Sequence, residues 1–155
     1  MLNVKLVCVG KLTEKFYKQA QDEYAKRLSR FVKLNIIELP DYATNNIKGE
    51  IVLMKEAEKI LGALGNEYVI AMDILGKSYD SIEWAKKLET DLAQGVSSIC
   101  FIIGGSLGLH DSVLQRANER MSMSKFTFCH NLARIMLLEQ LFRVNKILAN
   151  ESYHK

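Results

Sequence analysis

The sequence has little of what marks membrane or exported chains. Proline occurs once, at Pro40, and no apolar run approaches the roughly 20 residues that a membrane-spanning helix needs. Residues 1–10 are too short and too strand-like for a signal peptide. We therefore expect a cytoplasmic protein with no membrane segment.

Cysteine is also scarce. The three cysteines, Cys8, Cys100 and Cys129, lie far apart, and the first two fall within apolar strand patterns that are typical of small buried side chains. Cys129 precedes His130, but one cysteine beside one histidine does not complete the ligand set of a metal centre. We expect neither a disulfide nor a metal ion.

The motifs of several common enzyme classes are missing. The chain has no Gly-x-x-x-x-Gly-Lys-Ser/Thr phosphate loop, no Gly-x-Ser-x-Gly nucleophile elbow and no carboxylate cluster of the kind that binds magnesium. The run Gly104-Gly105-x-x-Gly108 is not the dinucleotide fingerprint and comes late in the chain. These absences weigh against polyphosphate binding, dinucleotide binding and common hydrolase chemistry.

The composition is that of a soluble globular domain. The chain has 155 residues, of which 48% are hydrophobic and 25% charged, and it shows no repeat or linker, so we expect one domain over 1–155. Its net charge of +3 permits a nucleic-acid partner without arguing strongly for one. Basic residues share one face of the helix expected over 13–30, which is typical of a solvated face or of a surface that contacts RNA.

Hydrophobic periodicity predicts alternating strands and helices. Strands are expected over 3–9, 34–39, 67–73, 97–103 and 121–128. Helices are expected over 13–30, 47–64, 80–94, 110–119 and 131–150. Such alternation predicts an α/β fold with a mostly parallel sheet and helices on both faces.

Local signals set the ends of these elements. Thr13 is expected to cap the first helix, and Asp80 with Glu83 forms a candidate capping box for the third. Gly65 is expected to close the second helix and Gly76 to lie in a turn, while the polar segment 41–48 predicts a mobile loop.

The last helix, 131–150, is apolar over most of its circumference. A helix of this kind needs burial on more than one side, which in a small domain indicates a partner subunit. Glu139 and Arg143 lie on its polar stripe at a spacing that favours an ion pair.

The stretch 97–110 is the strongest functional signal. An apolar strand ends in Gly104, Gly105 and Gly108, and a helix follows, which is how α/β proteins form ligand sites at the carboxyl ends of strands. A tight turn without a ligand has the same pattern. Together with Met72-Asp73 and 123–128, this turn predicts an apolar pocket that suits an uncharged adenosine and a sulfonium better than a polyphosphate.

Four motifs give the chain a family resemblance over nearly its whole length. They are Phe-Ile-Ile-Gly-Gly-Ser-Leu-Gly-Leu at 101–109, Met-Ser-Lys-Phe-Thr-Phe-Cys-His at 123–130, Glu-Gln-Leu-Phe-Arg at 139–143 and the terminal Tyr-His-Lys. The chain resembles the RlmH family, bacterial methyltransferases that act on N3 of a pseudouridine in large-subunit ribosomal RNA. The resemblance implies a SPOUT fold with a C-terminal trefoil knot, S-adenosylmethionine as cofactor, and a homodimer, acting on the assembled ribosome, whose active sites combine both chains.

The resemblance also implies roles for particular residues. The expected S-adenosylmethionine contacts are Met72, Gly104, Met123, Ser124, Lys125, Phe126, Thr127 and Phe128. Tyr153 is expected to stack on or hydrogen-bond the target base, His154 to act as a base or a phosphate contact, and Arg143 to contact RNA or to hold Glu139. The family's proline before the histidine is replaced by Cys129, which is expected to loosen the loop there.

Three other functions share parts of this pattern. A catalytically inactive RNA-binding module of the same fold would bind no cofactor, and the intact glycine turn argues against it. A nucleotide-binding regulatory domain would bind ATP or NAD, for which the phosphate motifs are missing. A related methyltransferase acting on transfer RNA is harder to separate, although the chain has no appended RNA-binding domain.

Overall fold

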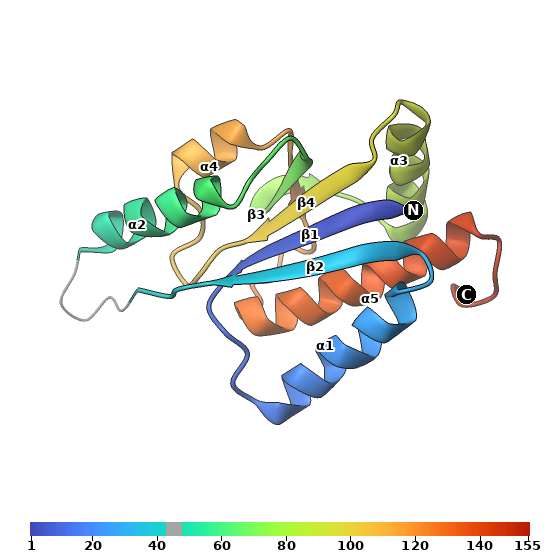
Figure 1. The fold of residues 1–155 in the computed structure, drawn as a ribbon, viewed down its shortest axis with the longest axis horizontal. Helices are drawn as coiled ribbons and strands as arrows, with labels where there is room; N and C mark the ends of the chain where they lie inside the picture. Colours follow the sequence, from blue (N-terminus) through green and yellow to red (C-terminus); the bar gives the residue numbers. More distant parts are fainter. Residues whose placement is uncertain (43–47) are drawn as a thin grey trace.

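A computed structural model describes residues 1–42 and 48–155 and shows a five-stranded sheet in the order β2-β1-β4-β3-β5 (Figure 1). The strands are β1 (Leu2–Val9), β2 (Val32–Leu39), β3 (Tyr68–Ser78), β4 (Ser98–Ile103) and β5 (Glu119–Ser122). The helices are α1 (Lys15–Leu28), α2 (Gly49–Gly62), α3 (Ser81–Ala93), α4 (Asp111–Arg116) and α5 (His130–Leu148). All four strand pairings among the described residues are parallel, which confirms the predicted α/β class. Most of the expected loop at 41–48 lies outside the described residues.

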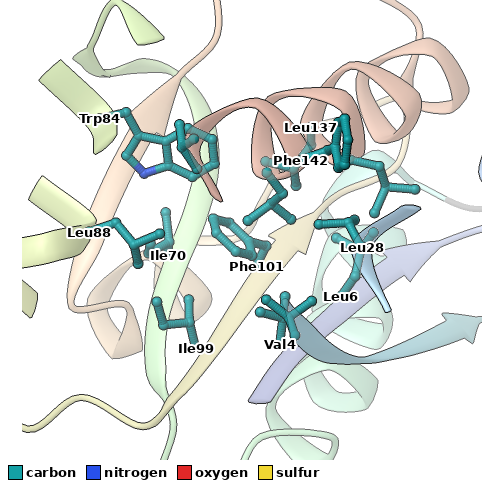
Figure 2. Packing of buried hydrophobic residues seen from close by; sticks show 14 of the residues in the cluster. Val4, Leu6, Leu28, Ile70, Trp84, Leu88, Ile99, Phe101, Leu137 and Phe142 are labelled. Carbon is teal, nitrogen blue, oxygen red and sulfur yellow. The ribbon is translucent and has the colours of Figure 1, made fainter. Parts of the chain in front are cut away.

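Helices cover both faces of the sheet because successive side chains of each buried strand point in opposite directions. Ile99, Phe101 and Ile103 of β4 pack in a core with α1, α3 and α5, as Figure 2 shows for Phe101. Cys100 and Ile102 point to the other face, where α2 and α4 cover them. The two buried cysteines thus act as the small apolar side chains that the sequence predicts, and Cys129 is also unpaired.

The expected cap is present on α3 and absent on α1. The Asp80 carboxylate accepts a hydrogen bond from the Glu83 backbone N–H at 2.8 Å, and the Glu83 carboxylate accepts one from the Asp80 N–H at 2.9 Å. The prediction for Thr13 is wrong, because Glu14 takes the N-cap position of α1 and Thr13 donates its hydroxyl hydrogen to the Glu14 carboxylate instead. Helix α2 also ends earlier than predicted, because its C-cap is Ala63 and not a residue next to Gly65.

Replacing Asp80 with alanine is expected to lower the free energy of unfolding by about 1 kcal/mol, because the first turn of α3 loses the acceptor for a backbone N–H. Urea denaturation at neutral pH measures this change. Asp80→Asn is the matched control, since an amide oxygen still accepts the bond and little stability should be lost. Equal losses in the two variants would contradict the capping role.

The fifth strand is shorter and earlier than predicted. The alternating segment 121–128 was expected to be a strand, but β5 covers only Glu119–Ser122, and residues 123–129 run on as an irregular segment. Gly76, expected in a turn, lies inside β3, where the register with β5 shifts between Met72 and Lys77. A Cβ at Gly76 would lie 2.6 Å from the Arg120 carbonyl carbon, so only glycine allows this approach of the two backbones.

The last helix is buried along much of its length, with Leu137, Leu138, Leu141, Phe142 and Val144 among its buried residues. In Figure 1, α5 lies beside α1 across one face of the sheet, and its C-terminal end lies near the amino ends of the strands. The knot and the partner subunit implied by the resemblance stay predictions. Among the described residues, no helix is long and apolar enough to cross a membrane.

Candidate cofactor pocket and C-terminal cluster

A cavity of about 630 Å³ lies at the carboxyl edge of the sheet. Its walls come from the middle of β3, just past its pairing with β4, from the ends of β4 and β5, from the irregular segment after β5 and from the first turn of α5. In parallel sheets this edge is where ligands bind, because the loops that follow neighbouring strands converge there. The size suits a ligand as large as a nucleoside with a side chain.

The glycine turn forms one wall of this cavity and folds tightly on itself. The Gly108 backbone N–H donates to the Gly105 carbonyl at 3.1 Å, and Gly108 has a φ of 80°, which side chains rarely adopt. A Cβ at Gly104 would lie 2.5 Å from the Gly108 carbonyl oxygen. The turn therefore requires glycine at both positions, and it presents backbone rather than side chains to the cavity.

The structure gathers seven of the eight predicted cofactor-binding residues around the cavity. They are Met72, Gly104, Met123, Ser124, Phe126, Thr127 and Phe128. Lys125 is exposed and is not part of the lining. The lining also includes residues that the sequence prediction did not name, among them Leu109, which directly follows the glycine turn, and His130 and Ala133, which lie in the first turn of the last helix.

The charge of the lining is acidic. Asp73 is the acidic residue of the lining, and no lysine or arginine of the described residues lines the cavity. Asp73 faces Arg120 at 3.7 Å, outside the lining. A wall without cationic side chains does not suit a polyphosphate, whose charge calls for lysine or arginine, and it does suit a positively charged ligand.

Cys129 lines the same cavity and is the N-cap residue of α5. Its thiol lies 3.7 Å from the Tyr17 hydroxyl of α1. The Leu132 backbone N–H, the Tyr17 contact and other backbone donors together lower the pKa of this thiol. The cysteine that replaces the family's proline thus bridges the irregular segment and α1, a contact that a proline cannot make.

The predicted substrate-binding residues form a second cluster, at the C-terminal half of α5. The Arg143 guanidinium donates two bonds to the Glu139 carboxylate, at 2.9 and 2.6 Å. Tyr153 packs edge-on against Phe142 with ring centroids 4.9 Å apart, and His154 Nδ1 lies 3.2 Å from Arg143. Burial and the neighbouring Glu139 raise the pKa of the Tyr153 hydroxyl. The tail is held by α5 and does not extend away from it.

This C-terminal cluster and the cavity lie apart in one chain. His130 and Ala133 of α5 line the cavity, whereas Arg143 and the tail residues are not in its lining. Ten residues separate Ala133 from Arg143, which corresponds to about 15 Å along an α-helix. Figure 1 shows the C-terminus at the end of α5 that is far from its start. The predicted catalytic and cofactor residues thus do not meet within a single chain.

The described residues contain no group of His, Cys, Asp or Glu side chains arranged to hold a metal ion. The Cys129–His130 pair lies at the cavity wall without further candidate ligands.

The sequence places the chain in a family of methyltransferases. The sequence profile of a family described as "Predicted SPOUT methyltransferase" matches residues 2–154. The chain belongs to this SPOUT methyltransferase family, which confirms the expected fold class and supports S-adenosylmethionine as cofactor.

Curated relatives are similar over the full chain. A protein of Clostridium botulinum (strain 657 / Type Ba4) named "Ribosomal RNA large subunit methyltransferase H" is 50% identical over 99% of this chain and 100% of its own length. A protein of the same name from Clostridium acetobutylicum is 49% identical with the same coverage. A solved structure of a probable methylase family protein from Haemophilus influenzae Rd KW20 matches 98% of this chain and 70% of that chain, with a TM-score of 0.55 and 12% identity. The last likeness concerns the fold alone.

Proposed function

We propose that this protein transfers a methyl group from S-adenosylmethionine to N3 of a pseudouridine in large-subunit ribosomal RNA. It acts in the cytoplasm as a homodimer, on the assembled ribosome. The main support is a sequence identity of 49 to 50%, over the full length, to proteins named as large-subunit ribosomal RNA methyltransferases. In addition, seven of the eight predicted cofactor residues line one cavity.

The residues at the cavity fit the cofactor. Gly104 and Gly108 form a tight turn that presents backbone to the cavity, and the neighbouring Met72, Phe128 and Leu109 offer apolar surface to an adenine ring. The lining carries one carboxylate and, among the described residues, no lysine or arginine, which suits a sulfonium. When bound, S-adenosylmethionine supplies a methyl group that is already activated for displacement.

The distance between the cavity and the C-terminal cluster supports a composite active site. Because Tyr153, His154 and Arg143 do not reach the cavity of their own chain, a second copy must bring them there. A two-fold dimer does so twice, since each chain then gives its cavity to one site and its tail to the other.

In the proposed mechanism, the protein positions the target base and assists the loss of one proton from it. The Tyr153 ring stacks on the unpaired base, with Arg143 held behind it at 4.8 Å from the ring centroid. N3 of the base loses its proton, and its electron pair forms the new bond to the methyl carbon while the old bond to sulfur breaks. Glu139 fixes Arg143 by two hydrogen bonds, which keeps a cation near the developing negative charge. The N3 proton passes to His154 or, where His154 contacts a phosphate instead, to water.

The test of this function uses ribosomes from cells that lack the modification. Purified protein and labelled S-adenosylmethionine are incubated with assembled ribosomes, with free ribosomal RNA and with transfer RNA, and the product nucleoside is identified by mass spectrometry. We expect 3-methylpseudouridine in ribosomes only. Methylated transfer RNA would contradict the ribosomal target, and cofactor binding without transfer to any RNA would favour an inactive binding module.

Replacing His154 with alanine is expected to lower the methylation rate by roughly tenfold to a hundredfold, because a charge-assisted contact is lost. Binding of S-adenosylmethionine, measured by calorimetry, should not change, since His154 is not part of the cavity. An unchanged methylation rate in the variant would contradict a role of His154 at the substrate.

A mixing experiment tests the composite site directly. Gly104→Ala chains, which are defective at the cavity, are mixed with His154→Ala chains, which are defective in the tail. Random exchange makes half of the dimers mixed, each with one fully intact site, so roughly a quarter of wild-type activity should return. Sites formed within one chain would give no recovery.

A further inference from the structure

A buried acidic side chain lies directly behind the glycine turn. Glu56 of α2 is only 4% exposed, although glutamate is rarely buried without a partner. A Cβ placed on Gly105 would lie 3.4 and 3.5 Å from the two Glu56 carboxylate oxygens. The backbone of Gly105, which lines the cavity, is therefore what separates this carboxylate from a bound ligand.

No cation of the described residues forms an ion pair with this carboxylate. Burial raises the pKa of Glu56, and the nearby Asp41 carboxylate raises it further, while the Tyr42 backbone N–H donates a hydrogen bond that lowers it. A buried charge without a counter-ion is costly, so its presence calls for an explanation outside local stability.

The second carboxylate near the cavity is Asp73 in its wall. Its pairing with Arg120 is loose at 3.7 Å, and one of its oxygens also accepts a bond from the Leu75 backbone N–H at 3.2 Å. The two acidic groups come from different elements, Glu56 from α2 behind the turn that follows β4, and Asp73 from the middle of β3.

We infer that Glu56, assisted by Asp73, makes the cavity distinguish the cationic methyl donor from its neutral product. This inference rests on the proposed function. Methyl transfer converts a sulfonium into an uncharged thioether, so the ligand loses one positive charge during the reaction. The ammonium and carboxylate of its methionyl part are the same before and after, and their interactions cancel in the comparison. A carboxylate near the sulfur then holds the donor more tightly without holding the product.

Elementary electrostatics sets the size of the effect. A carboxylate and a ligand charge on opposite sides of the Gly105 backbone, partly screened by solvent, would change the affinity ratio by roughly tenfold. Asp73 is partly neutralised by Arg120, so its removal should change the ratio by only about threefold.

The experiment is calorimetric titration of wild type, Glu56→Gln and Asp73→Asn with three ligands at about pH 8. The ligands are S-adenosylmethionine, S-adenosylhomocysteine and sinefungin, which carries a protonated amine where the donor carries the sulfonium. Glu56→Gln should weaken donor and sinefungin binding roughly tenfold, which corresponds to about 1.4 kcal/mol. The product's affinity should not change. Glu58→Gln is the matched control, because Glu58 lies on the exposed face of the same helix.

The outcomes separate this inference from the proposed function. If Glu56→Gln weakens binding of donor and product equally, the residue merely supports the turn and the inference fails, although wild type still binds its cofactor. If wild type binds none of the three ligands, the proposed function fails and this inference with it. Thermal unfolding checks that the Gln variant is folded. If it is not, Asp73→Asn decides, since an unchanged ratio there contradicts a role of the wall charges.

Discussion

Gly104→Ala is expected to weaken S-adenosylmethionine binding at least a hundredfold while the chain stays folded. The new Cβ would lie 2.5 Å from the Gly108 carbonyl oxygen and 3.0 Å from its carbon, and both atoms belong to backbone that no rotamer change can move. The turn must therefore shift as a unit, and displacement by about 1 Å at a ligand site costs on the order of a hundredfold. Calorimetry with the purified variant measures the loss.

The matched control is the same substitution at Gly62, where a Cβ meets nothing within 4 Å. Gly62→Ala lies at the end of α2 and should leave cofactor binding unchanged. Thermal unfolding of Gly104→Ala should show a folded protein, because Gly104 is only half-buried and lies outside both cores. Wild-type affinity in the Gly104 variant would mean that the turn is an ordinary connection and the ligand binds elsewhere.

Arg134→Met is expected to destabilise the protein by about 3 kcal/mol, because it leaves polar groups without their buried partner. Arg134 is 1% exposed and donates to the Glu38 carboxylate at 2.7 Å, to Gln21 at 3.1 Å and to the Gly10 carbonyl at 3.2 Å. One side chain of α5 thus ties together β1, β2 and α1. Urea denaturation measures the loss, and Arg30→Met, which breaks the exposed pair with Glu151, should cost less than about 1 kcal/mol.

The same pair predicts a pH dependence with a defined sign. Burial by itself would raise the pKa of Glu38, but bonds from Arg134 and the Leu12 backbone N–H outweigh burial and lower it below its ordinary value of 4.5. A lowered pKa stabilises the folded state above 4.5, and this contribution is lost as the pH falls through the lowered value. The stability gap between wild type and Arg134→Met should therefore be largest at neutral pH and shrink below 4.5. A gap independent of pH would contradict the ion pair, and Arg134→Met combined with Glu38→Gln should regain part of the loss.

The sequence alone predicted the elements whose signals are local. The strands around 3–9 and 97–103 are buried on both faces, so their continuous apolar runs identify them as strands. The capping box at Asp80 depends only on residues three positions apart. Local signals failed where a distant partner decides. The alternation over 121–128 is that of a strand, but β5 stops at Ser122, and the residues that follow line the cavity instead.

Thr13 and Glu14 show the same limit on a smaller scale. Both residues can precede a helix, and the choice between them depends on where α1 packs against α5 rather than on either side chain alone. Gly76 was predicted in a turn because glycine is frequent there, whereas it is the backbone of Arg120, more than 40 residues later, that requires it.

By itself, the sequence determined the α/β class, the glycine turn and, through its motifs, the family, and it named seven of the residues that line the cavity. The periodicity of a chain indicates which side of each element is buried, and a motif indicates a local backbone shape, so both can be recognised from the sequence alone. Only the tertiary structure placed Glu56 behind Gly105 and Arg134 on Glu38, and only it separated the tail from the cavity of its own chain. These are contacts between elements far apart in sequence, and what decides them is how the helices pack on the two faces of the sheet.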